Sequence, residues 1–189
     1  DRIGPDAWTK VRNMPWTASL ELRRRLAWPL VRAQFAWHGI DWGTDWKIFG
    51  RPILQRHRGS RIALGDGLTL RSWPRSNPLA PTAPVVLSTR RADAVLEVGT
   101  DCGFTGTTLV AADRITIGDR VLVGGNASIV DFDFHPLTPE GRAENINAGA
   151  AAPIVIEDDV FVGMDALVMK GVTIGEGAVV GAGSVVTQD

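Results

Sequence analysis

From Leu64 onward, an aliphatic residue occupies every sixth position over long stretches of the chain. The clearest run has six members without a miss: Ile156, Val162, Val168, Ile174, Val180 and Val186. A glycine follows three of these residues. Two earlier runs have the same spacing, the second more weakly: Ile117, Val123 and Ile129, then Val86, Ala92, Val98, Phe104 and Val110. A period of six fits neither the 3.6-residue repeat of an α-helix nor the alternation of an ordinary strand.

The six-residue period is typical of a triangular β-helix, in which three short strands make one coil of 18 residues. The recurring aliphatic side chain points inward and stacks on the one 18 positions away, while a small residue beside it lets the backbone turn the corner. Two stretches interrupt the repeat, residues 71–84 and 130–153. We therefore predict an all-β fold over residues 64–189, a parallel β-helix of about five hexapeptide-repeat coils with two excursions.

Residues 1–63 form a second predicted region, an N-terminal extension rich in tryptophan. All seven tryptophans fall within the first 73 residues, and apolar residues near a helical period predict a helix over residues 18–38. Pro29 should kink or divide this helix, and Gly39 should end it. The arginines at 23–25 allow two interpretations, an anchor on a membrane surface or a helix whose aromatic face packs on the rest of the protein. We favour the second.

Composition removes several classes of function. The net charge of −1 offers no basic field for nucleic acid. The single cysteine, Cys102, excludes an internal disulfide, and no neighbouring histidine activates it, so we expect a small core residue. Only one histidine lies beyond residue 57, which argues against a three-histidine zinc site, and we expect no metal. No apolar run approaches ~20 residues and none is signal-like, so we predict no transmembrane segment and a cytoplasmic protein.

The interruptions are where chemistry is expected, because a repetitive coil offers no special site. The first, residues 71–84, carries four prolines and is either a cover over the early coils or a substrate contact. The second contains His135, with Asp133 and Asp131 two and four residues before it. An aspartate that accepts a hydrogen bond from one ring nitrogen would leave the other basic, as a general base requires. The alternative is a surface histidine in a polar loop.

Two motifs give the chain a resemblance to a known family. These are DFDFHPL at residues 131–137 and VTIG…VVGAGSVVT within residues 172–187. With the repeat over residues 64–189, they resemble the hexapeptide-repeat acyltransferases, in particular the sugar and glycan O-acetyltransferases of the maltose, galactoside, nodulation-factor and colanic-acid type. The resemblance implies a left-handed β-helix, a homotrimer with the site between subunits, and acetyl-CoA as acyl donor. It also implies that His135 deprotonates an acceptor hydroxyl, which attacks the thioester directly.

The resemblance also assigns contacts with CoA to the late coils. The positions that match are Gly163, Met164, Ala182, Gly183 and Thr187. The sequence departs from the family at Gln188, where lysine is common, and at Phe161, where tryptophan is frequent. Asn126, at a corner before the second excursion, either orients the acceptor or the histidine, or simply tolerates a left-handed backbone. We favour the backbone role.

Two other functions remain as alternatives. Streptogramin and chloramphenicol acetyltransferases share the coil and a loop histidine, although their loops differ from DFDFHPL. A non-catalytic β-helix scaffold with an aromatic docking helix would bind no CoA and would be indifferent to His135→Ala. A zinc hydratase of the γ-carbonic-anhydrase type is excluded, because the predicted β-helix supplies one histidine per chain. We expect acceptor choice to depend on residues 1–63 and 71–84, where no motif is present.

Overall fold

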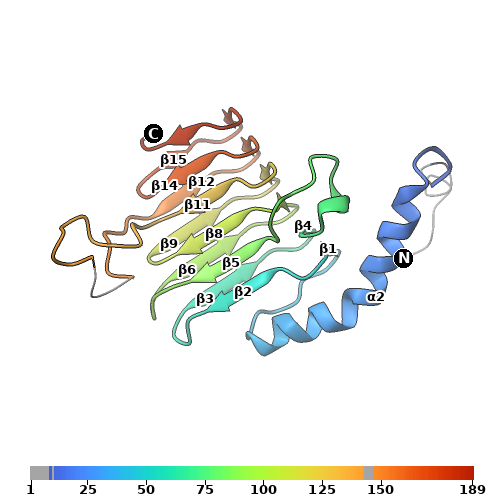
Figure 1. Cartoon of the computed structure of the whole chain (residues 1–189), viewed down its shortest axis with the longest axis horizontal. Coiled ribbons are helices and arrows are strands. Elements are labelled where there is room, and N and C mark those ends of the chain that lie inside the picture. The colour runs from blue at the N-terminus through green and yellow to red at the C-terminus, as the bar shows by residue number, and fades with distance from the viewer. Residues whose placement is uncertain (1–8, 10, 143–146) are drawn as a thin grey trace.

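The structure, a computed structural model, describes residue 9, residues 11–142 and residues 147–189. Its main body is a β-helix built from three parallel sheets (Figure 1). Sheet A contains β1 (Lys47–Phe49), β4 (Thr69–Arg71), β7 (Gly103–Thr105), β10 (Leu122–Val123), β13 (Phe161–Val162) and β16 (Val179–Val180). Sheet B contains β2 (Ile53–Arg56), β5 (Val86–Thr89), β8 (Thr108–Ala111), β11 (Ser128–Val130), β14 (Leu167–Met169) and β17 (Val185–Val186). Sheet C contains β3 (Arg61–Leu64), β6 (Val95–Val98), β9 (Arg114–Ile117), β12 (Ile154–Ile156) and β15 (Thr173–Ile174).

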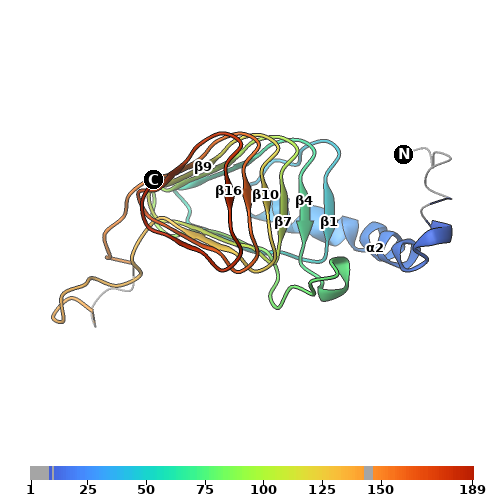
Figure 2. The ribbon, with the colours of Figure 1, turned by 90° about the horizontal axis from the view of Figure 1, so that it is seen from above.

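The chain visits sheets A, B and C in turn, so that three strands make one coil and the coils stack as about six triangles (Figure 2). The register is the one that the repeat predicts. Ile156 pairs with Ile174 in sheet C, and Val162 pairs with Val180 in sheet A, each partner 18 positions away. These side chains belong to one continuous core that fills the inside of the triangle. The predicted β-helix is therefore confirmed.

The β-helix begins earlier than predicted. Its first coil starts at Lys47, because β1 and β2 pair with β4 and β5 in the same register as later coils. The predicted start at residue 64 is thus too late, and the count of five coils becomes about six. The period hides this coil because the turn at 57–60 spaces its inward residues, Leu54 and Ile62, eight positions apart.

The weakest of the three predicted runs is correct in part. Val98 and Phe104 are core residues, as expected. Leu87 points inward in place of Val86, because the turn at 90–94 between β5 and β6 is longer than the repeat allows. Val110 is buried on the outer face of sheet B instead of the core. A longer turn shifts the phase of the pattern, and the sequence alone cannot show where that happens.

The N-terminal helix, α2 (Trp16–Trp37), covers the first coil. Pro29 lies within it and does not divide it, although the helix changes direction along its length (Figure 1). In its second half, Phe35 is buried against Trp42 and Trp46, with ring centroids 5.5 and 5.4 Å away. The packing interpretation is confirmed for that half, whereas the apolar side chains of Leu22 and other residues of the first half are exposed.

Both excursions lie within one residue of their predicted bounds. The first joins β4 to β5 at the edge between sheets A and B, and contains a short 3₁₀ helix, η1 (Pro74–Ser76). The second joins β11 to β12 at the edge between sheets B and C, and its residues 143–146 lie outside the described residues. No helix in the described part of the chain is long and apolar enough to cross a membrane.

Candidate active site

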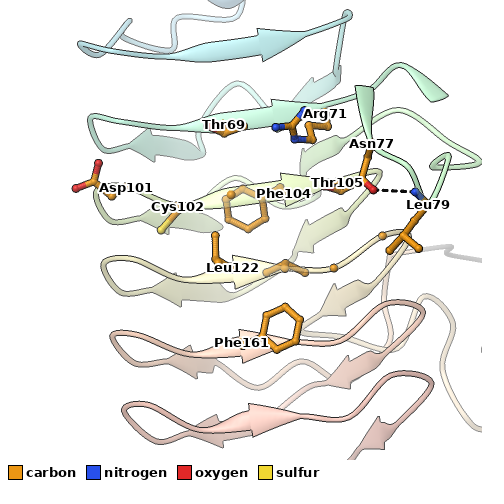
Figure 3. A pocket seen from close by; sticks show the side chains of 14 residues that line it. Thr69, Arg71, Asn77, Leu79, Asp101, Cys102, Phe104, Thr105, Leu122 and Phe161 are labelled. Carbon is orange, nitrogen blue, oxygen red and sulfur yellow. Dashed lines mark hydrogen bonds between the residues drawn. The ribbon is translucent and has the colours of Figure 1, made fainter. Parts of the chain in front are cut away.

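A hollow of about 410 Å³ lies on the outer face of sheet A, beside the first excursion (Figure 3). Strands β4, β7, β10 and β13 form its floor, since alternate residues of each strand point outward while their neighbours fill the core. The excursion forms one wall. The side chains that face the hollow include Arg71, Asn77, Leu79, Thr105, Leu122 and Phe161. A space of this size holds a ligand as large as a single sugar ring.

Asn126 fastens the first excursion beside the hollow. Its side-chain oxygen accepts hydrogen bonds from the backbone N–H of Thr82 at 2.9 Å and from the Thr82 hydroxyl at 3.1 Å. Its backbone has a φ of 59°, in the left-handed region that asparagine tolerates better than most residues. The left-handed backbone of Asn126 agrees with the role that we favoured. Its side chain has a second role, because it anchors the excursion that forms the wall of the hollow.

Arg71 supplies the positive charge of the hollow. Its side chain is half-buried, and its guanidinium carbon lies 4.8 Å from the centre of the Phe49 ring. One guanidinium nitrogen donates to the carbonyl oxygen of Ser76 in the excursion. Burial lowers the pKa of Arg71. Within the described residues no carboxylate forms an ion pair with this guanidinium, although other arginines have such partners.

The second excursion is fastened to the coils at its start and its return. The buried carboxylate of Asp131 accepts hydrogen bonds from the backbone N–H groups of Ala112 at 2.6 Å and Asp113 at 2.9 Å. Burial raises the pKa of Asp131. On the return, Arg91 donates to the carbonyl oxygen of Asn147 at 2.8 Å. Both contacts join the excursion to the edge between sheets B and C.

The residues just before His135 also contact the coils, through an ion pair and through packed aromatic rings. Asp133 forms an ion pair with Lys170 of a later coil at 2.8 Å. Phe132 packs on Val110 at the outer face of sheet B, and Phe134 lies against Phe132 with ring centroids 4.6 Å apart. The coils therefore fix the position at which the polypeptide leads into His135.

His135 itself is exposed, and its partner differs from the predicted one. Its Nδ1 lies 3.2 Å from the carbonyl oxygen of Arg142, which can only accept a hydrogen bond. This places the proton on Nδ1 and leaves Nε2 as the basic nitrogen. The expectation that an aspartate orients the ring is wrong for the described contacts, because Asp131 bonds backbone amides and Asp133 bonds Lys170. Both aspartates anchor the loop.

Within one chain, His135 and the hollow face away from each other. The second excursion leaves the edge between sheets B and C, and this edge lies opposite sheet A in the triangle (Figure 2). A hydroxyl bound in the hollow could therefore meet His135 only from another chain, or after a large movement of the second excursion.

The residues assigned to CoA lie mainly at the edge between sheets A and B. Gly163, Met164, Ala182 and Gly183 stand there in two adjacent coils, and the N–H of Gly183 donates to the carbonyl of Met164 at 2.8 Å. A Cβ at Gly163 would lie 2.5 Å from the backbone nitrogen of Ala182, so close stacking of the coils already requires this glycine. Thr187 follows β17, at the far end of that strand. The structure thus brings four of the five residues together.

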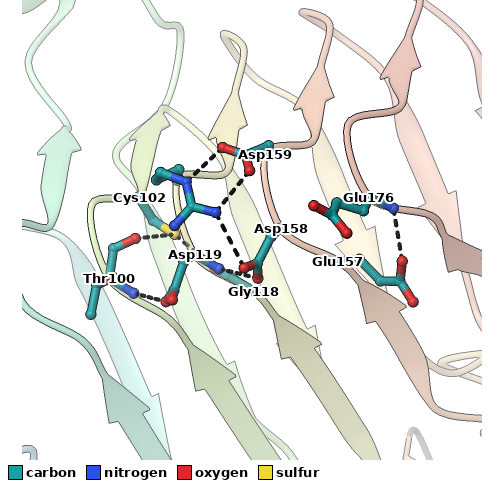
Figure 4. Close-up of polar contacts among 9 residues, drawn as sticks. Thr100, Cys102, Gly118, Asp119, Glu157, Asp158, Asp159 and Glu176 are labelled. Carbon is teal, nitrogen blue, oxygen red and sulfur yellow. Dashed lines mark hydrogen bonds and ion pairs between the residues drawn. The ribbon is translucent and has the colours of Figure 1, made fainter.

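At the edge between sheets C and A, carboxylates hold successive coils (Figure 4). Asp119 accepts a hydrogen bond from the N–H of Thr100 at 2.6 Å, and Asp158 accepts one from the N–H of Asp119 at 2.8 Å. Cys102, buried beside them, donates to the carbonyl of Gly118 at 3.1 Å, and burial raises the pKa of its thiol to about 11. At neutral pH this thiol is a core group, not a nucleophile. No three histidine, cysteine or acidic residues gather as metal ligands in the described part of the chain.

Sequence reasoning did not single out Arg71 or Leu122 as site residues. Arg71 is the first residue of the predicted excursion and the last residue of β4, and nothing in the sequence shows that it has no acidic partner in the fold. Leu122 alternates with core residues in the repeat, so the period alone marks it as an outward position without a role. A search for apolar residues at outward positions of several coils would have found Leu122 and Phe161.

Comparisons with known proteins agree with the repeat. A family model described as the hexapeptide repeat of succinyl-transferase matches residues 114–130 and 153–188. A Schizosaccharomyces pombe protein, named only as an acetyltransferase, is 48% identical over 75 residues, which are 40% of this chain and 35% of that protein. The galactoside O-acetyltransferase of Lactococcus lactis is 39% identical over 82 residues, which are 43% of this chain and 38% of that enzyme. The matched region is thus little more than a third of each curated relative.

A solved structure shows the same fold. A hexapeptide-repeat acetyltransferase from Vibrio cholerae is 24% identical with a TM-score of 0.50, over 90% of this chain and 82% of that one. A second structure of the Vibrio protein, with acetyl coenzyme A bound, matches at a TM-score of 0.49 and 25% identity, over 91% and 80% of the two chains. The six-residue core period, the matched repeats and the shared fold agree with one another, and over the matched stretches the chain is similar to hexapeptide-repeat acetyltransferases.

Proposed function

We propose that the protein is an acetyl-CoA-dependent O-acetyltransferase that modifies a hydroxyl of a sugar or glycan, with His135 as general base. The observation that carries the proposal is the state of His135, an exposed imidazole on an anchored loop whose Nδ1 faces a carbonyl oxygen. This arrangement leaves Nε2 free to accept a proton. The similarity to acetyltransferases over the matched repeats supports acetyl-CoA as the acyl donor, and the hollow on sheet A offers room for a sugar ring.

The proposed reaction follows from these parts. Nε2 of His135 removes the proton of the acceptor hydroxyl as its oxygen attacks the carbonyl carbon of the acetyl thioester. The new C–O bond forms, the C–S bond breaks, and the proton held by His135 passes to the departing CoA thiolate. The direct attack forms no acetyl-enzyme, and Cys102, which is buried with a raised pKa, is unsuited to carry an acetyl group.

The surface of the coils supports a homotrimer with shared sites. The outward side chains of sheet A include Leu122, Phe161 and Val179, which are 53, 45 and 71% exposed. Sheet C instead carries charged residues such as Arg61 and Glu97, paired at 2.8 Å and suited to water. A second copy packed against the last coil of sheet A would cover Val179 and leave the hollow open. If that copy placed its second excursion at the hollow, it would supply the histidine that the excursion of the same chain does not bring there.

The proposal is tested by CoA release from acetyl-CoA, followed with a thiol reagent over a panel of hydroxylated acceptors. We expect acceptor-dependent release by the unmodified protein and its loss in His135→Ala. His57→Ala is the matched control, since His57 is exposed at the same edge of the first coil. Silence over the whole panel, with no rise of the melting temperature on adding CoA, would contradict the proposal and favour a scaffold.

A further inference from the structure

We propose that the hollow on sheet A recognises an anionic group of the acceptor through Arg71, so that the substrates are acidic sugars. This inference rests on the proposed acetyl transfer and narrows its acceptor. It gives the first excursion a role, because the excursion holds the arginine and forms one wall of the hollow.

Arg71 has no ion-pair partner among the described residues, and Asp101, a carboxylate that also lines the hollow, lies at the opposite end of its floor (Figure 3). Arg71 is half-buried, and the only hydrogen bond identified for its side chain among the described residues goes to the neutral carbonyl of Ser76. A guanidinium has five N–H donors, so several remain for a ligand. A positive charge that is partly removed from water gains from an anion at hydrogen-bond distance. Phe49 lies against the guanidinium and limits its movement.

The rest of the hollow suits a sugar ring. Leu79, Leu122 and Phe161 give it apolar walls for the faces of the ring. Asn77 and Thr105 add polar side chains that can bond hydroxyl groups. A guanidinium fork matches both carboxylates and phosphates, so uronic acids and sugar phosphates share the required chemistry.

The position of Arg71 along the β-helix separates it from the proposed donor contacts. It lies in the second coil, whereas Met164 and Ala182 lie in the fifth and sixth. At roughly 4.8 Å per coil, three to four coils are about 14–19 Å. We assign the anion at Arg71 to the acceptor, and the KM for acetyl-CoA tests the alternative that Arg71 meets the phosphates of an extended CoA molecule.

The experiment compares acceptors that differ in one charged group. Galactose is paired with galacturonate, glucose with glucuronate, and N-acetylglucosamine with its 1-phosphate, and CoA release gives kcat/KM for each. We expect the acidic member of at least one pair to be preferred about 10- to 100-fold, and Arg71→Gln to remove this preference. Arg71→Gln should lower kcat/KM for the acidic sugar of a pair by a larger factor than kcat/KM for its neutral partner. Arg75→Gln is the matched control, because Arg75 is exposed on the same excursion.

Three results would overturn the inference. Equal use of acidic and neutral sugars would do so while leaving acetyl transfer established. A preference that survives Arg71→Gln would do so as well. A rise in the KM for acetyl-CoA alone would instead assign Arg71 to the donor.

Absence of transfer to every sugar would count against the proposed function, and the hollow would then be tested by binding. If acidic sugars raise the melting temperature of the unmodified protein but not of Arg71→Gln, the inference stands without the activity. If they raise neither, it fails.

Discussion

In the coils, each inward side chain rests on its counterpart one coil away, as Leu109, Ile129 and Val168 do in sheet B. The two excursions have no such counterpart. Each is held by individual polar contacts, Asn126 to Thr82 for the first and Asp131 to backbone amides for the second. The coils thus supply a rigid frame through repetition, while the excursions carry the charged and titratable groups. Substitutions in the core of the coils should therefore lower the stability of the protein, and substitutions in the excursions should lower its activity.

The largest effect is expected on activity, in the second excursion. His135→Asn should lower kcat/KM for acetyl transfer by about 100- to 10,000-fold, since the amide cannot accept the proton. The melting temperature should stay unchanged, because His135 is exposed and has one long contact, to the Arg142 carbonyl. Steady-state CoA release and thermal unfolding measure the two quantities. His57→Asn is the control, and an unfolded His135→Asn protein would contradict the separation.

Substitutions in the core of the coils should lower the stability of the protein. Ile129→Ala leaves a cavity between Leu109 and Val168 and should lower the free energy of unfolding by about 2–5 kcal/mol. Ser128→Ala, at the neighbouring outward position, is the matched control. Urea denaturation measures both. A loss below that of the control would mean that the stacked core does not carry the stability of the frame.

A smaller and pH-dependent effect is expected at Asp131. Burial raises its pKa, so the folded state binds this proton more tightly than the unfolded state does. Its contribution to stability is full below the unfolded pKa of about 3.9, and falls as pH rises through the higher folded value. Relative to Asp131→Asn, the unmodified protein should therefore lose stability from pH 4 upward. Urea titrations at several pH values measure this. If the unmodified protein instead gained stability relative to Asp131→Asn with rising pH, the hydrogen bonds from backbone N–H groups would have a larger effect on the pKa of Asp131 than burial has.

The smallest effect is expected at Cys102, whose thiol should not react with a thiol reagent in the folded protein. With a pKa of about 11 and a buried side chain, the thiol should resist a thiol reagent at pH 8 until the protein unfolds. Labelling with and without denaturant measures this. Rapid labelling of the native protein would contradict it, and would also disturb the CoA-release assay.

The sequence was sufficient for most of the fold, because a six-residue period leaves few alternatives to a triangular coil. It failed where turns changed the spacing, at 57–60 and 90–94, since the phase of the pattern is lost there. Both excursions and His135 could be located, because they interrupt the repeat. The partner of His135 could not, since a carbonyl of Arg142 leaves no mark on residue type. Arg71 was missed for a similar reason, as its lack of an acidic neighbour is a property of the fold.

We propose that the coils of one chain and the excursion of another form each site. It is tested by coexpressing two inactive variants with different tags, His135→Asn and Ala182→Trp, the second of which blocks the exposed edge assigned to CoA. Mixed trimers purified on both tags should regain about one third of the unmodified activity, since one interface in each then has an intact histidine and an intact groove. No activity in the mixed trimers, or a monomer in sedimentation, would contradict the shared site.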